Sequence, residues 1–286
     1  MSRVLLFLST NFAVVLVLGF VLNLLGLNQH GSGSTPFLIM AAVFGMGGSF
    51  ISLWMSKSMA LRSTGAQSIE SPRNELEKWL VDTRQAQEEK GGIVKPVFAI
   101  FDCAAPNAFA TGANKNAALV AVSTGLLNNM SREEVEAVLG HEVSHVANGD
   151  MVTLSLIQGV VNTFVMVFAS IVASALSRGD GQSRGGMGYY FAYSIAQMFF
   201  GFLASIIVMW FSRYREFRAD EGGASLSTTP KMIAALKRLQ SSEASELPAS
   251  MAAFGISGNI KQGLQSLLTT HPPLSDRIAA LENSRR

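Results

Sequence analysis

The chain has 286 residues, of which 49% are hydrophobic and only 15% are charged, and this composition favours a membrane protein over an ordinary soluble one. The formal net charge of +2 is small, and the sequence has no run of lysine and arginine interleaved with aromatic residues, which argues against nucleic-acid binding. The single cysteine, Cys103, excludes an intramolecular disulfide framework and a cysteine-type zinc finger, and we interpret it as a small buried apolar residue.

The N-terminal part, residues 1–56, predicts a transmembrane hairpin. Its two apolar runs, residues 4–27 and 36–55, contain no charged side chain. At about 1.5 Å of rise per residue, the first run extends roughly 35 Å as a helix, which is enough to cross the hydrocarbon core of a bilayer. This run is long for a signal peptide, and no clear cleavage site follows it, so we expect it to be retained.

Residues 57–151 predict the first part of a soluble domain. Ser71 as an N-cap and Pro72 at the first helical position predict a surface helix that stops at Gly91. Two β-type runs, residues 97–101 and 117–123, predict a small sheet.

Asn107 lies between these two β-type runs, in a segment rich in Gly, Asn and Ala. A free strand edge at this position would bind an extended substrate by backbone pairing. Turn chemistry explains the segment nearly as well, so both interpretations stay open for Asn107.

The segment HEVSHVANGD, which begins at residue 141, carries the most informative motif of the chain. A capping box that starts at Ser131 and an Asn-Gly stop predict a helix around it. His141 and His145, four residues apart, then present both imidazoles on one face, as two zinc ligands require, and Glu142 is placed to reach a water at the metal. A structural pair of helix histidines is the alternative.

Residues 152–212 predict a second transmembrane hairpin, with uncharged apolar runs at 152–176 and 188–211. The loop between the first two runs has no Lys or Arg, whereas Lys57 and further basic residues follow the second run, so both termini and the soluble domain are expected in the cytoplasm. Arg178 and Arg184, between the last two runs, disagree with this orientation, and this hairpin could instead be re-entrant or pack on the soluble domain.

Residues 213–286 predict the second part of the soluble domain. A catalytic zinc site needs a third protein ligand and an open position. Glu216 is the strongest candidate ligand, and Asp220, one helical turn later, could stand behind it and accept the spare N–H of a ligating histidine. A solvated acidic face is the alternative for this pair. Because His30 falls in the loop assigned to the opposite side of the membrane, His271 is the other histidine to consider.

Together, HEVSHVANGD, SRYREFRAD, THPPLSDR and PNAFATG resemble the peptidase family that includes the HtpX heat-shock membrane proteases and the CAAX prenyl endopeptidase, over essentially the whole chain. The resemblance implies a mainly α membrane protein with four apolar helices in two hairpins and a cytoplasmic α+β zincin-type domain with a small sheet. It also implies one zinc ion per chain. By the resemblance, the zinc ligands are His141, His145 and Glu216.

The resemblance also implies roles for the remaining site residues. Glu142 would be the catalytic base, which takes a proton from water whose pKa zinc lowers. Asp220 would be the partner of a ligating histidine. His271 and Arg277 match family positions thought to meet the substrate or the developing oxyanion, although a turn role before two prolines is the alternative for His271.

The function implied is ATP-independent cleavage of misfolded or damaged membrane proteins at the cytoplasmic face of the bacterial inner membrane, with self-cleavage. The partners are then membrane-protein substrates and the lipid bilayer. A metal transporter and a non-catalytic zinc-binding scaffold are the rivals. The apolar runs contain no Asp, Glu, Lys, Arg or His, which argues against a transporter, and Glu142 between the two histidines argues against a scaffold.

Overall fold

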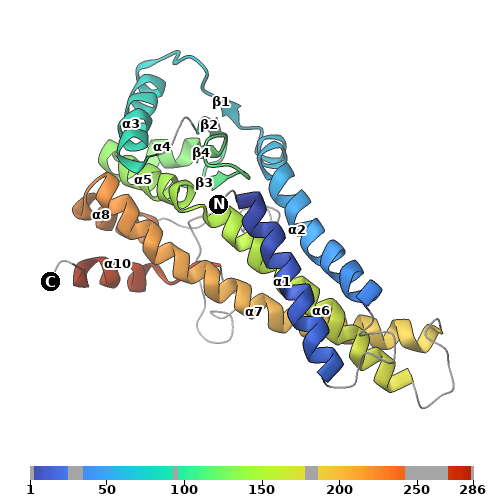
Figure 1. Cartoon of the computed structure of the whole chain (residues 1–286). Helices are drawn as coiled ribbons and strands as arrows, with labels where there is room; N and C mark the ends of the chain where they lie inside the picture. The colour runs from blue at the N-terminus through green and yellow to red at the C-terminus, as the bar shows by residue number, and fades with distance from the viewer. Residues whose placement is uncertain (1–2, 25–34, 93–95, 178–185, 242–269, 285–286) are drawn as a thin grey trace. The chain divides into compact units, whose positions relative to one another are not determined.

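The structure is a computed structural model, and it describes residues 3–24, 35–92, 96–177, 186–241 and 270–284 (Figure 1). The chain forms two compact units, residues 1–52 with 153–208 and residues 53–152 with 209–286. His30, most of the loop between residues 177 and 187, and part of the predicted C-terminal helical region lie outside the described residues.

Long apolar helices make up the first unit, and all but the first of them extend past its boundaries in the sequence. They are α1 (Arg3–Leu24), α2 (Thr35–Thr64), α6 (Asp150–Ser177) and α7 (Met187–Leu226). Three of them, α2, α6 and α7, are long and apolar enough to cross a membrane. In α1 the apolar stretch described, Phe12–Leu24, is shorter. The structure therefore supports three candidate spans, and the fourth stays a prediction.

Glycines allow α2 and α6 to approach closely within the first unit. A Cβ atom added to Gly45 would lie 2.5 Å from Thr163 Oγ1, and one added to Gly159 would lie 3.0 Å from Met46 Cα. Small residues at such contacts are typical of helix pairs in membranes, where close packing replaces the hydrophobic effect.

A small mixed sheet lies in the second unit. Its strands are β1 (Gln67–Ser68), β2 (Val97–Phe101), β3 (Ala108–Thr111) and β4 (Leu119–Ser123), in the order β1-β2-β4-β3. The β2–β4 pair is parallel and the other two pairs are antiparallel. The predicted runs correspond to β2 and β4. The sequence did not predict β1, which is two residues long, or β3, whose Ala-rich segment lacks the usual β-branched alternation.

The first helix of the second unit, α3 (Glu75–Gly91), begins later than predicted. Its N-cap is Asn74, whose side chain accepts a hydrogen bond from the Glu77 N–H at 2.8 Å, so Ser71 is not the cap. The Glu77 side chain in turn accepts a hydrogen bond from the Arg73 N–H, and these two local bonds fix the start. The helix ends at Gly91, as predicted.

The helix that carries the histidine motif is α5 (Arg132–Asn148), and its capping box at Ser131 is confirmed. It contacts β3, β4 and α3, and three shorter helices also pack in this unit: α4 (Thr124–Asn129), α8 (Thr229–Ser241) and α10 (Leu274–Asn283). Buried residues of the sheet and of these helices form one apolar core, so the motif rests on a packed scaffold.

Candidate active site

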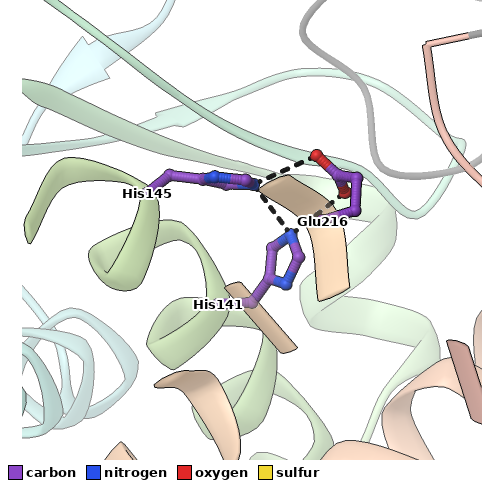
Figure 2. Close-up of side chains that lie close together, drawn as sticks. All are labelled: His141, His145 and Glu216. Carbon is purple, nitrogen blue, oxygen red and sulfur yellow. Dashed lines mark hydrogen bonds and ion pairs between the residues drawn. The ribbon is translucent and has the colours of Figure 1, made fainter. Parts of the chain in front are cut away.

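The two histidines of α5 lie next to each other and are buried. His141 is 1% exposed, and its Nε2 atom lies 3.1 Å from Nε2 of His145 (Figure 2). The four-residue spacing on one helix brings the imidazoles together, as the sequence predicts.

Helix α7 brings a carboxylate to the same point. Glu216 is fully buried, with Oε1 3.2 Å from His145 Nε2 and Oε2 3.5 Å from His141 Nε2 (Figure 2). One ligand atom from each of these three residues lies within 4.8 Å of the others. The structure thus brings together the three side chains that the sequence singled out as candidate metal ligands.

These separations fit a zinc ion. Nitrogen and oxygen ligands lie about 2.1 Å from zinc, so two ligand atoms of a tetrahedral site are about 3.4 Å apart. Within the described part of the chain, neither carboxylate oxygen of Glu216 has an aligned hydrogen-bond donor, although the histidine nitrogens are close. A buried carboxylate without such bonds needs positive charge beside it; the Arg277 guanidinium lies 3.4 Å from Oε2, and a metal ion between the three ligand atoms would add to it. The residues present therefore fit a metal ion held between them.

Two glycines, Gly222 and Gly223, bring α7 close to α5 at this site. A Cβ atom on Gly223 would lie 2.8 Å from the backbone nitrogen of His141, and one on Gly222 would lie 2.4 Å from Ser144 Oγ. Only a residue without a side chain permits this approach. The sequence motifs did not single out this glycine pair, which begins two residues after Asp220.

Each histidine also contacts a carboxylate on the far side of its ring. His141 Nδ1 lies 2.9 Å from Asp220 Oδ1. His145 Nδ1 lies 2.6 Å from Asp150 Oδ2, a contact that the sequence analysis missed. Asp150 follows the end of α5, so no helical spacing connects it to His145. Its place in the HEVSHVANGD motif was the only available signal.

Arg277, from α10, lies behind the candidate metal ligands. It is 1% exposed and donates hydrogen bonds to both oxygens of Asp220, and its Nη1 lies 3.4 Å from Glu216 Oε2. Its guanidinium is thus engaged by carboxylates of the site itself. The sequence motif indicates for Arg277 only a contact with the substrate or the oxyanion, so this internal ion pair is an addition from the structure.

The remaining predicted site residues occupy different positions. His271 is the least buried, with its side chain 13% exposed and Nδ1 3.0 Å from Glu216 Oε2. Glu142 is buried beside the histidines, and its Oε1 has no hydrogen-bond partner among the described residues. Asn107 is buried just before β3, where its backbone N–H donates to Ser123 Oγ, and no described contact joins it to the three candidate ligands.

The electrostatics of the site favour positive charge between the histidines and carboxylates. Burial lowers the pKa of His141, but the carboxylates of Asp220 and Glu216 close to its ring outweigh burial and raise that pKa to about 9. Burial alone would raise the pKa of Glu216, yet His271 and His145 hold it well below the ordinary value. For Glu142, burial dominates and raises the pKa, as suits a group that accepts and returns a proton.

Known proteins resemble this chain over its full length. It is 56% identical to "Protease HtpX" of Idiomarina loihiensis, with 100% of both chains covered, and 57% identical to "Protease HtpX" of Vibrio vulnificus, with 99% of this chain and 100% of the relative covered. The crystal structure of S. mikatae Ste24p shares the fold, with a TM-score of 0.64 at 17% identity, over 97% of this chain and 67% of Ste24p.

The family comparison agrees with these relatives. Residues 76–285, which include α5, α10 and the charged end of α7, match the family described as Peptidase family M48. The chain belongs to peptidase family M48 and is a membrane metalloprotease.

Proposed function

We propose that this protein is a zinc endopeptidase that cleaves misfolded or damaged membrane proteins, without ATP, at the cytoplasmic face of the bacterial inner membrane. The observation that supports it most directly is the arrangement of His141, His145 and Glu216, whose ligand atoms are separated as a tetrahedral zinc site requires.

In this proposal, His141, His145 and Glu216 would hold one zinc ion. Two imidazoles and one carboxylate are a ligand set of catalytic zinc sites that leaves a fourth position open. When bound, zinc would polarise the carbonyl of the scissile peptide bond and lower the pKa of water towards neutrality.

Glu142 is the proposed general base. It accepts a proton from the water that attacks the peptide carbonyl and then delivers a proton to the nitrogen of the leaving amine. Its burial supports this role, because the raised pKa makes the carboxylate a better proton acceptor. Glu142 directly follows His141 in the sequence, so it lies on α5, the helix that carries two of the proposed ligands.

His271 is the proposed hydrogen-bond donor to the oxyanion that forms on the carbonyl oxygen. It is partly exposed while the proposed ligands are buried, and it lies beside Glu216. Arg277 is a weaker candidate, since Asp220 already binds its guanidinium at two points. A group that is to stabilise developing charge must have a donor directed at the reacting oxygen.

The proposed class of substrate follows from how few residues separate the candidate active site from the apolar helices. Glu216 lies six residues after Trp210, which is exposed and stacks on Tyr214 near the end of the apolar part of α7. Aromatic residues of this kind are typical of membrane interfaces. A site so close to the interface suits membrane proteins and their cytoplasmic segments. We propose that outer strand β3, which begins directly after the buried Asn107, pairs with such an extended segment through its backbone.

The orientation of the protein in the membrane and the division of the chain into hairpins and a protease domain are part of the same proposal. Residues 1–56 and 152–212 form the membrane hairpins, and residues 57–151 and 213–286 form the cytoplasmic protease domain. A reporter fused after Arg286 is expected to behave as cytoplasmic, and one inserted into residues 28–35 as external. The opposite pattern would place the active site on the other side of the membrane.

The activity is tested by digestion of casein or a model membrane protein with the detergent-purified protein. Cleavage is expected to stop when a zinc chelator is added and to return when zinc is restored. A protein that binds zinc at the three residues but cuts neither substrate would instead support the non-catalytic scaffold.

A further inference from the structure

One buried carboxylate next to the candidate metal ligands has no assigned role. Asp150 is 4% exposed, and its Oδ2 lies 2.6 Å from Nδ1 of His145. We infer that Asp150 is a positioning residue: its carboxylate fixes the tautomer and the ring orientation of His145, so that the other ring nitrogen faces the metal. The inference rests on the proposed function, in which His145 is a metal ligand.

The position of the proton on His145 follows from the contacts on its two sides. Asp150 Oδ2, at 2.6 Å, is an acceptor, so Nδ1 carries the hydrogen. In the neutral imidazole, which is the form that binds a metal, Nε2 then has the lone pair; this atom faces His141 Nε2 at 3.1 Å and Glu216 Oε1 at 3.2 Å. A lone pair at this atom is what a metal ion needs from a histidine.

The same arrangement occurs on the other histidine, which supports the inference independently. His141 Nδ1 lies 2.9 Å from Asp220 Oδ1, while its Nε2 faces the same point. Each of the two histidines therefore has a carboxylate at Nδ1. For His141 it is Asp220 of α7, and for His145 it is Asp150, the first residue of α6. The two rings lie at 87° to each other, so each needs its own carboxylate to fix its plane.

The local backbone holds Asp150 in place. Gly149 has φ of 72°, the left-handed region that favours glycine, and its N–H bonds to the carbonyls of His145 and Val146. This turn ends α5 and starts α6 within one residue, which directs the Asp150 side chain back to the ring of His145. The carboxylate is thus positioned by the backbone and not by a flexible loop.

A purely structural role makes a different prediction. Asp150 is also the acidic residue in the first turn of α6, where a negative charge is favourable beside the helix N-terminus. If that were its only role, its replacement would lower the stability of the fold, but the metal affinity of the folded protein would not change.

The experiment compares metal binding in variants that all carry Glu142→Gln, which prevents self-cleavage. Zinc affinity is measured by competition with a chelator, and the geometry of the site by the visible absorption spectrum of bound cobalt. Asp150→Ala is expected to bind zinc about 10- to 100-fold more weakly and to change the cobalt spectrum. Asp150→Asn is expected to lose less affinity, because its carbonyl still accepts the bond from Nδ1. Glu75→Ala, which removes an exposed acid from the first turn of α3, is the matched control.

The outcomes separate this inference from the proposed metal site. If both Asp150 variants bind zinc as tightly as their parent while His145→Ala loses it, the positioning role is wrong and the metal site stands. If His145→Ala also binds zinc normally, the metal site itself is wrong. Should Asp150→Ala fail to fold, Asp150→Asn decides, since equal affinity and an unchanged cobalt spectrum in that variant overturn the inference.

Discussion

Asp220 and Arg277 form a buried two-point ion pair in which Nε donates to Oδ2 at 2.7 Å and Nη2 donates to Oδ1 at 2.5 Å. Asp220 also lies 2.9 Å from His141 Nδ1. Burial would raise the pKa of Asp220, but Arg277 and the hydrogen bonds lower it below its ordinary value. Helix α10 thereby contributes to the candidate metal site through the carboxylate that orients His141.

Arg277→Met is expected to lower both metal affinity and stability. Removing one partner leaves Asp220 buried without its cation, which typically costs about 3–5 kcal/mol. Chelator competition and thermal unfolding of the variant measure the two effects. Lys237→Met is the matched control, since it breaks an exposed ion pair between α8 and α10 worth about 1 kcal/mol or less. An arginine that only met substrate would behave otherwise, with unchanged zinc content and a raised KM.

Glu142→Gln is expected to keep zinc and to lose proteolysis. The amide removes the proton acceptor but leaves all three proposed ligands in place, and the loss of a general base lowers turnover by about 10²- to 10⁴-fold. Zinc content and casein cleavage are measured on the same preparation. Cleavage by the purified variant at a rate near that of the parent would exclude Glu142 as the base.

Glu216→Ala and His271→Ala are expected to separate metal binding from turnover. Loss of the Glu216 carboxylate leaves two ligands, so zinc occupancy should fall sharply. His271→Ala should retain most zinc and lose mainly turnover, because His271 is proposed to contact the oxyanion.

Metal content measured on both variants, each in the Glu142→Gln background, tests the ligand assignment, and turnover of His271→Ala is measured without that background. Full zinc in the first variant and loss in the second would exchange the two roles. Loss in both would indicate four protein ligands in the resting enzyme.

Much of this arrangement was predictable because it follows from local spacing. The capping box at Ser131 and the four-residue separation of the histidines determine a helix face, and α5 forms as expected. The same holds for Glu216 and Asp220, which lie one turn apart on the continuous helix α7. Periodicity on a single helix is a short-range property, so the sequence alone indicates it.

The missed features depend on contacts between segments distant in sequence or across a turn. Arg277 lies 57 residues after Asp220 and on a different helix. No rule of sequence spacing predicts which carboxylate it will contact. Asp150 contacts His145 across the turn at Gly149, whose φ of 72° lies in the left-handed region. The strand β3 has few β-branched residues, and its pairing with β4 decides its conformation.

The close approach of α5 and α7 leads to the last prediction, that Gly223→Ala weakens metal binding. The new Cβ atom would lie 2.8 Å from the backbone nitrogen of His141, so one helix must move, and Glu216 and Asp220 move with α7 relative to the histidines. Overpacking of this kind typically costs about 1–3 kcal/mol. Zinc affinity should fall together with the temperature of unfolding.

Gly201→Ala on the same helix is the matched control, since a Cβ atom there meets nothing within 4 Å. In this control both quantities should stay near those of the parent, because the exchange adds a methyl group in open space. If Gly223→Ala bound zinc as tightly as Gly201→Ala, the position of α7 would not limit the geometry of the site. The carboxylates would then have enough freedom to follow the histidines, and the glycine pair would matter for packing alone.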